Sequence, residues 1–490
     1  MDSSAWFWLL FTLWTIGVIY IGYKGYTLSP NFDEFSVPRT TARIGPYQLG
    51  MSIAATQASV ATFMGVAGFV YLGGLSGLWW LMMVPLVHAF GIVIAGKYFR
   101  EIGLKLGSLQ VPDWMGHRFG SDVVRGLASL IYFFNLFFVI SILAGFGHIF
   151  HIIMGMDYQT GIIIAAIIAA LYSFFGGNYA VIKTDVLQTV IMCLLAVIIA
   201  SLGFVFFNSI GEINLGLFQQ NPALLKPFNP GFMIFAGPLA IFGFSFYQFV
   251  MLLSPHMANK FLMLQEAKDF KKMIFTAGIT VFILSLSVFG GLYARVLLPG
   301  LQYPDRATLE LITTYFPGIL AAILGLGLIS AGTSTLDSIL VSMGTVAGND
   351  VFRRIIAKRT NMPAEKTERT SFLIGRIVII FACAFGAFYA MKPPALLAIL
   401  SAFGVFGFLA GCVGPMLWGM YWKGANKYGA IAAMIVGPAV HMYLFFGKII
   451  PNSFICGTYA TITGAVVMLI VSLATQGIEK NTMQDAVAKG

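Results

Sequence analysis

Residues 316–347 read FPGILAAILGLGLISAGTSTLDSILVSMGTVA. A run of this kind can cross a bilayer as a helix, because about 20 apolar residues span roughly 30 Å of hydrocarbon. Its one charged side chain, Asp337, lies deep inside the run. A carboxylate within hydrocarbon costs on the order of a few kcal/mol and is therefore expected where a membrane protein needs a polar site. The stretch predicts a membrane-spanning helix with a functional polar face.

Similar apolar runs recur along the whole chain. The chain has 490 residues, of which 58% are hydrophobic and 10% charged, and its mean hydropathy is +0.86. These values lie outside the range of soluble domains. We expect an all-α polytopic membrane protein that forms a single membrane domain over residues 1–490, with about thirteen spans at approximately 5–23, 47–76, 79–97, 124–152, 159–176, 184–208, 232–254, 273–296, 316–347, 371–390, 394–421, 426–447 and 455–476.

The net charge of +10 is distributed unevenly between the two sides of the predicted bundle. With the N-terminus outside, 24 of the 29 Lys and Arg residues fall on or near the cytoplasmic side. The five outside are Lys226, Arg295, Arg306, Lys392 and Lys448. This asymmetry follows the positive-inside rule. The charge therefore orients the protein in the cell membrane with a cytoplasmic C-terminus, and no nucleic-acid partner is needed to explain it.

Two of the spans are interrupted. The second contains five glycines between positions 50 and 74, and the seventh contains Gly237, Pro238 and Gly243 before Ser254-Pro255. Paired breaks of this kind are typical of transporter binding sites, although close helix packing would also favour glycine. If 47–208 and 232–421 are two five-helix units, a broken helix opens each unit, and the odd helix count inverts the second unit relative to the first.

The ninth span concentrates oxygen atoms on one face. Ser334, Asp337 and Ser338 occupy positions i, i+3 and i+4, Thr335 lies beside them, and the carbonyl of Ala331 is one turn earlier. Na⁺ is a hard cation that binds several hydroxyl, carbonyl and carboxylate oxygens. Back-bonding of the hydroxyls to the preceding turn is the alternative. We expect a sodium site here.

Asp185 begins the predicted sixth span and allows two interpretations. It could be a favourable charge at a helix N-terminus, paired with Lys183. If it instead faces the ninth span, it marks the inner end of a cation exit path together with Asp337 and Ser338.

Polar and aromatic side chains near the two breaks predict a small occluded solute site. Phe244 could equally be a lipid-facing or packing residue. The candidate solute-binding residues are Gln57, Ser59 and Thr62 on the second span and Phe244, Tyr247 and Gln248 on the seventh.

Catalytic motifs are not found in the sequence. His88, His256 and His441 are isolated from carboxylates and cysteines at metal-ligand spacing, and no Gly-rich loop ends in Lys-Ser or Lys-Thr. We therefore expect a protein that is not an enzyme and that draws its work from an ion gradient.

Several motifs resemble the sodium:solute symporter family, and the similarity runs over nearly the whole chain. GGNYAVIKTDVLQ at 176–188 is similar to the family's first signature, and STLDS at 334–338 with GNDVF at 348–352 resembles its ion-binding helix. VPDW at 111–114 followed by RFGS, and SPH at 254–256 with Lys260-Phe261, resemble further family segments on the cytoplasmic side. These segments look closest to the proline, pantothenate and monocarboxylate branch.

The resemblance implies a LeuT-type inverted repeat of five plus five helices, preceded by the helix at 5–23 and followed by two helices within 426–476. It also implies a sodium site made by the carbonyls of Ala55, Ala58 and Ala331 and the hydroxyls of Ser334 and Thr335. In members with a second sodium ion, the additional site resembles Asp185, Ser334, Asp337 and Ser338.

The substrate class follows from one further position of the resemblance. Members that bind sugars or sialic acid have a polar side chain where this chain has Leu81, flanked by Trp79, Trp80 and Met82. An apolar wall would leave sugar hydroxyls unpaired, which is costly. We expect a sodium-coupled symporter that imports a small monocarboxylate or amino acid, such as pantothenate or proline, by alternating access. A proton-coupled carrier using Asp337 or Asp185, and a channel or the membrane input domain of a sensor, are the alternatives.

Overall fold

The computed structural model describes residues 3–41, 43–392 and 396–476. Within these ranges all of the regular secondary structure is helical. Ten helical stretches are long and apolar enough to cross a membrane, or eleven when the bent pair α13 and α14 counts as one span. The multi-span prediction is confirmed, and the count of thirteen is approximate. The first two residues of the predicted span 394–421 and most of the predicted cytoplasmic tail lie outside the described ranges.

The helices of the first half are α1 (Ser3–Thr27), α2 (Phe32–Ser36), α3 (Pro46–Gln57), η1 (Ala61–Val66), α4 (Ala67–Gly73), α5 (Trp79–Gly91), α6 (Lys97–Lys105), α7 (Val111–Arg118), α8 (Asp122–Tyr132), α9 (Leu136–Met154), α10 (Tyr158–Ser201), α11 (Gly203–Phe206) and α12 (Ile210–Gln220). The second half contains α13 (Pro238–Met251), α14 (Pro255–Met263), α15 (Phe270–Ser285), α16 (Phe289–Leu297), η9 (Pro304–Arg306), α17 (Ala307–Tyr315), α18 (Gly318–Thr345), η10 (Val346–Ala357), α19 (Ala364–Ala390), α20 (Leu397–Tyr421), α21 (Lys427–Phe446) and α22 (Ser453–Ala474).

Both expected helix breaks are present. Helix α3 ends at Gln57, Ala58 has the non-helical angles φ −92° and ψ 71°, and the helix resumes in η1 at Ala61. The second break separates α13 from α14, whose axes differ by 45°. Pro255, which has no backbone N–H to continue a helix, starts α14. The predicted span 232–254 therefore begins later than expected, at Pro238, and its second half continues to Met263.

Two predicted spans, 159–176 and 184–208, are joined almost without a gap in α10. The joint is Gly177, with φ 56° and ψ −165°. A Cβ at this position would lie 2.7 Å from the carbonyl oxygen of Phe35, so only glycine fits this conformation and this contact. The helix resumes at once after the glycine, and the expected start at residue 184 is wrong. Asp185 thus lies about two turns inside a helix rather than at its N-terminus.

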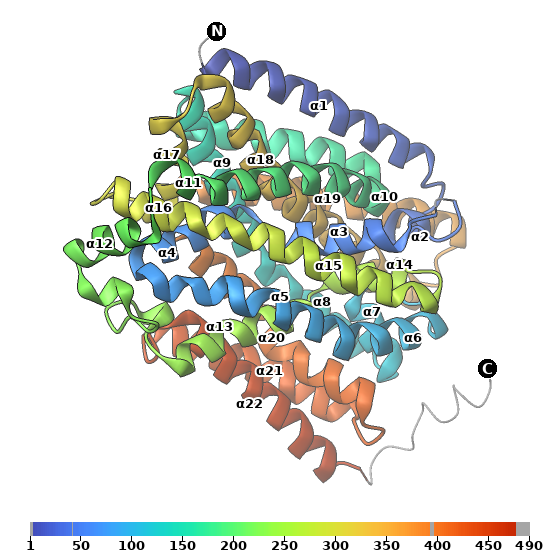
Figure 1. The fold of residues 1–490 in the computed structure, drawn as a ribbon. Helices are drawn as coiled ribbons and strands as arrows, with labels where there is room; N and C mark the ends of the chain where they lie inside the picture. Colours follow the sequence, from blue (N-terminus) through green and yellow to red (C-terminus); the bar gives the residue numbers. More distant parts are fainter. Residues whose placement is uncertain (1–2, 42, 393–395, 477–490) are drawn as a thin grey trace.

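The centre of the bundle is formed by α18 and α20. In their membrane-spanning parts, 83% of the residues of α18 and 89% of those of α20 are buried. The corresponding share for α1 is 28%. Helix α18 packs against α10, α1, α19, α9 and α3. Figure 1 shows α1 at one edge of the bundle and α21 and α22 at the opposite edge. The polar face of α18 is therefore enclosed by protein, where its oxygen atoms can serve a site.

Candidate functional site

Two hydroxyl groups of α18 face the break that follows α3. The Ser334 hydroxyl lies 3.1 Å from the carbonyl oxygen of Ala55 and 3.1 Å from that of Ala331. The Thr335 hydroxyl donates to the carbonyl of Thr56 at 2.9 Å. All of these residues are fully buried. The α18 hydroxyls and the carbonyls of the break therefore form one oxygen-rich contact between the two helices.

Three of the five predicted sodium ligands thus converge, namely Ala55, Ala331 and Ser334. Ala58 lies at the break itself, where its N–H bonds to the carbonyls of Ala54 and Ala55. Thr335 is next to this group and contacts the carbonyl of Thr56, one residue beyond the predicted Ala55. The structure thus brings Ala55, Ala331 and Ser334 into direct contact, with Thr335 beside them on the carbonyl of Thr56.

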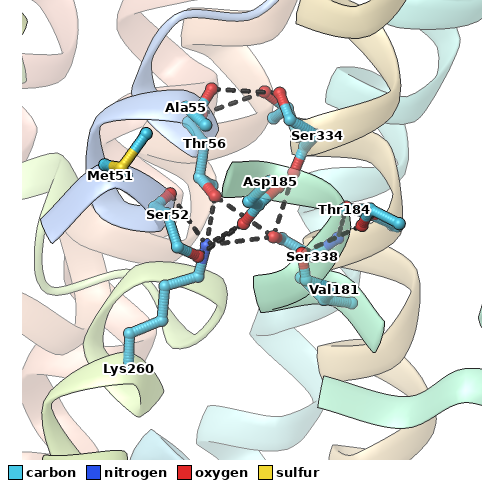
Figure 2. A network of polar contacts seen from close by, with 12 residues as sticks. Met51, Ser52, Ala55, Thr56, Val181, Thr184, Asp185, Lys260, Ser334 and Ser338 are labelled. Atoms are coloured by element: carbon cyan, nitrogen blue, oxygen red, sulfur yellow. Dashed lines mark hydrogen bonds and ion pairs between the residues drawn. The ribbon is translucent and has the colours of Figure 1, made fainter. Parts of the chain in front are cut away.

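Directly beside this contact, the ammonium group of Lys260 lies among four oxygen atoms. Its Nζ is 3.0 Å from Asp185 Oδ2, 3.1 Å from the carbonyl of Ser52 and 3.2 Å from Ser338 Oγ. It also donates to Thr56 Oγ1. Figure 2 shows the lysine reaching from α14 into the space between these groups. Lys260 and Asp185 are both 0% exposed, so this is a fully buried ion pair.

Asp337, predicted at the same second ion position, points to a different side of the network. Its Oδ1 accepts the N–H of Ser338 at 2.6 Å, and its Oδ2 lies 3.4 Å from the Thr184 hydroxyl. The carboxylate is fully buried. Asp185 and Ser338 therefore share Lys260, whereas Asp337 is held by α10 and by its own backbone.

The structure excludes the interpretation of Asp185 as a charge paired with Lys183. The Lys183 ammonium contacts Gln48 Oε1 at 3.1 Å instead, and Asp185 binds Lys260 and the hydroxyl of Ser52. The sequence identifies Lys260 only as part of a motif on the cytoplasmic side. A single lysine between Met257 and Phe261, just after a proline-marked break, was the signal that could have identified it.

A small cavity with about 20 Å³ of free space, roughly enough for one water molecule, lies between the two broken helices. The side-chain amides of Gln57 and Gln248 meet in it through a hydrogen bond, and Gln57 Oε1 has no hydrogen-bond partner. None of the described residues that line the cavity carries a charge. Its walls are formed by Gln57, Ser59, Ala61, Thr62, Val66, Trp80, Phe138, Tyr247, Gln248, Met251, Ala398, Ser401 and Phe454.

Five of the six predicted solute residues line this cavity, and Phe244 does not. Phe244 packs behind the wall against Trp80, with the ring centroids 4.9 Å apart. The side chain that α5 presents to the cavity is Trp80, while its neighbour Met82 is 58% exposed on the outer surface. Four wall residues, Phe138, Ala398, Ser401 and Phe454, are not identified from the sequence because their helices are distant in sequence from the breaks. Ala61, Val66 and Met251 lie on the broken helices but are apolar and give no polar signal, and Trp80 is considered there only as a neighbour of Leu81.

Comparison with known proteins agrees with this geometry. A sequence profile described as the sodium:solute symporter family matches residues 40–437. The chain is 26% identical over 432 residues to the sodium/pantothenate symporter of Haemophilus influenzae, covering 85% of this chain and 87% of the relative. It is 25% identical over 498 residues to the sodium/proline symporter of Staphylococcus aureus, covering 98% of this chain and 94% of the relative.

The fold is also found among solved structures. A Na⁺-coupled sialic acid symporter in a substrate-bound outward-open state superimposes with a TM-score of 0.76 at 18% identity, over 97% of this chain and 98% of that one. The architecture is therefore that of the LeuT-fold transporters. The chain belongs to the sodium:solute symporter family and is a multi-pass membrane protein that couples the import of a small organic solute to sodium.

Proposed function

We propose that the solute is a small monocarboxylate or amino acid, such as pantothenate or proline, and that it binds in the cavity between the two breaks. The observation that carries this proposal is the neutral, amide-bearing lining of the cavity, in which Gln57 and Gln248 meet. Helix η1 starts at this cavity with Ala61, and the positive end of a helix dipole favours a carboxylate. The pantothenate and proline symporters among the relatives support the same class.

We further propose that Na⁺ binds to the carbonyls of Ala55, Ala58 and Ala331 and the hydroxyls of Ser334 and Thr335. In this arrangement the ion lies between the hydroxyl and carbonyl oxygens that are now joined by hydrogen bonds, and the hydroxyls keep their hydrogens. The solute residue Gln57 lies only two positions after Ala55 along the chain. Sodium that orders the break therefore also orders the solute site, and each ligand raises the affinity of the other.

The path of the ion continues from this site towards Asp185, Asp337 and Ser338, which we propose as the inner exit. We place the N-terminus outside and the C-terminus in the cytoplasm, so that α14 lies in the inner half of the bundle. The two repeats are 47–208 and 232–421, with the leading helix at 5–23 and the trailing helices within 426–476. Alternating access then opens the cavity first to one side of the membrane and next to the other.

The proposal is tested by the thermal stability of the purified protein in NaCl and in an equal concentration of choline chloride. The measurement is repeated with pantothenate, proline and other monocarboxylates in the presence of Na⁺. We expect a sodium-specific rise in Tm that one of these compounds enlarges, because a ligand that binds only the folded state stabilises it.

The ion site is tested with a double substitution, Ser334→Ala with Thr335→Ala, which removes both hydroxyl ligands. We expect the sodium-specific rise to disappear. Ser330→Ala is the matched control, since Ser330 is a buried serine on the same helix whose hydroxyl has no hydrogen-bond partner. A sodium response that survives the double substitution would contradict the ion site, and a response to sugars alone would contradict the solute class.

A further inference from the structure

The four oxygen atoms around Lys260 Nζ have the composition of a cation site. They are one carboxylate oxygen from Asp185, one backbone carbonyl from Ser52 and two hydroxyls, from Thr56 and Ser338. An ammonium group has three N–H donors, which is fewer than the oxygens that surround it. Hard cations are bound by mixed oxygen sets of this kind. The oxygen atoms therefore form a cation site, and the cation in it is the protein's own Lys260 ammonium group.

The charges of the buried network agree with this interpretation. The side chains of Asp185, Asp337 and Lys260 are all fully buried. With both carboxylates ionised, the three side chains together carry one net negative charge, so one additional monovalent cation makes the network neutral. A charge left uncompensated in such surroundings is costly. The lysine therefore reduces the number of free cations that the network requires from two to one.

We propose that Lys260 is a built-in cation that permanently takes the second cation position of this transporter, so that each chain binds one sodium ion. The inference rests on the proposed sodium site at Ser334 and Thr335 for that single ion. A free ion would dissociate with the solute, whereas Lys260 is tethered to α14 and stays with the protein. The driving force per transport cycle is then that of one Na⁺.

The tether also joins four helices at one place. Lys260 lies on α14, Ser52 and Thr56 on α3, Asp185 on α10 and Ser338 on α18. Figure 2 shows the side chains of Thr56, Asp185 and Ser338 converging with Ser52 on the ammonium group of Lys260. Moving α14 away from α10 requires the ammonium to leave Asp185, and moving α3 away from α14 requires it to leave Ser52 and Thr56. The fixed cation thus remains part of the bundle through the cycle, while the sodium ion is exchanged.

The test counts bound sodium directly, with Na⁺ itself as the probe. Equilibrium binding of ²²Na⁺ to the purified full chain, in a choline chloride background, is measured for the unmodified protein and for Lys260→Ala. We expect one ion per chain in the unmodified protein and two in the variant, because the vacated oxygen cage then accepts a free ion. Lys268→Met is the matched control, since Lys268 is an exposed lysine close to α14 in the chain, and it should leave one ion bound.

A second pair of variants separates this inference from the proposed sodium site. Lys260→Ala combined with Asp185→Asn removes both charges of the pair and should return the count to one. The double substitution Ser334→Ala with Thr335→Ala should leave no sodium ion bound. Combined with Lys260→Ala, it should leave one ion bound per chain, where Lys260→Ala by itself binds two.

Three results would overturn the proposal. The first is two bound ions per unmodified chain, a result that does not depend on the folding of any variant. The second is one bound ion per chain in Lys260→Ala that is shown to be folded. No ion in the unmodified protein would reject the proposed sodium site as well. One ion in the unmodified protein that survives Ser334→Ala with Thr335→Ala would contradict only the proposed location of the sodium site.

Discussion

The solute cavity and the ion network are adjacent but differ in chemistry. The side chain of Gln57 lines the cavity, whereas the hydroxyl of its neighbour Thr56 belongs to the network around Lys260. The cavity has amides, hydroxyls and aromatic walls and is neutral. The network holds a lysine and two carboxylates, all fully buried. Buried charge therefore lies on one side of the break, and under the proposed function it carries the coupling to sodium while the neutral contacts on the other side select the solute.

The largest effect is expected from breaking the charge balance of the network. Asp185→Asn leaves the Lys260 ammonium buried without its counter-charge, and removal of one partner of a buried pair costs about 3–5 kcal/mol. We expect a large fall in Tm and in the yield of folded protein, measured by thermal unfolding in detergent.

Asp337→Asn is the informative contrast for that experiment. Asp337 makes hydrogen bonds to the N–H of Ser338 and to Thr184, and its carboxylate does not contact Lys260 directly. Its substitution should therefore lower Tm less than Asp185→Asn. Equal losses in the two variants would show that the Lys260 pair has no special part in stability.

A third buried carboxyl, Asp305, lies outside the spans and forms no ion pair with any of the described residues. Asp305 in η9 accepts the N–H of Leu397 at 2.7 Å, and its other oxygen has no partner. Burial raises the pKa of the Asp305 carboxyl to about 7, with the hydrogen bond from Leu397 acting in the opposite direction. A raised pKa means that the folded state favours the protonated form, so this stabilisation is complete below about pH 4 and is lost as the pH rises through 7.

We therefore expect Asp305→Asn to remove part of the pH dependence of stability. The amide keeps an acceptor for Leu397 and cannot ionise, so the difference in unfolding free energy between pH 5 and pH 8 should shrink by on the order of a few kcal/mol. Thermal unfolding of both proteins across this pH range measures the effect. Parallel curves for the two proteins would show that Asp305 does not titrate in this range.

Changes in the neutral cavity should have smaller effects on stability and visible effects on the solute. Gln57→Ala and Gln248→Ala each remove one partner of the amide pair, and a lost hydrogen bond to a bound solute costs about 1–2 kcal/mol. We expect the apparent affinity for the solute to fall roughly 10-fold, with the Tm in choline chloride little changed. Radiolabelled uptake in proteoliposomes measures the first quantity. Retained solute affinity in both variants would place the solute elsewhere.

The smallest effect is expected at Leu81, which does not line the cavity. Leu81→Ala should change solute affinity less than about twofold, a difference below roughly 0.5 kcal/mol. Trp80→Ala, one residue earlier and in the cavity wall, should reduce it more. A reversed order in uptake assays would mean that α5 presents a different face to the solute.

The sequence already indicated much of this architecture. The apolar runs and the positive-inside charge pattern are local properties, and so are the glycines and prolines that break helices α3 and α13–α14. Membrane helices satisfy their own backbone hydrogen bonds, so their positions can be predicted before any packing is known. The face of α18 with Ser334, Asp337 and Ser338 was found for the same reason, because its spacing lies within one helix.

Contacts between helices distant in the sequence were decided only by the tertiary structure. Lys260 and Asp185 are 75 residues apart, and Ser334 and Ala55 are 279 apart. Trp80, Ser401 and Phe454 reach the cavity from three separate helices. No local pattern specifies which residues meet across such distances, since packing selects one face of each helix against another. Local patterns thus predict most of the membrane helices, their two breaks and the family, whereas packing between helices joins spans in α10, places Lys260 beside Asp185 and assembles the neutral cavity next to it.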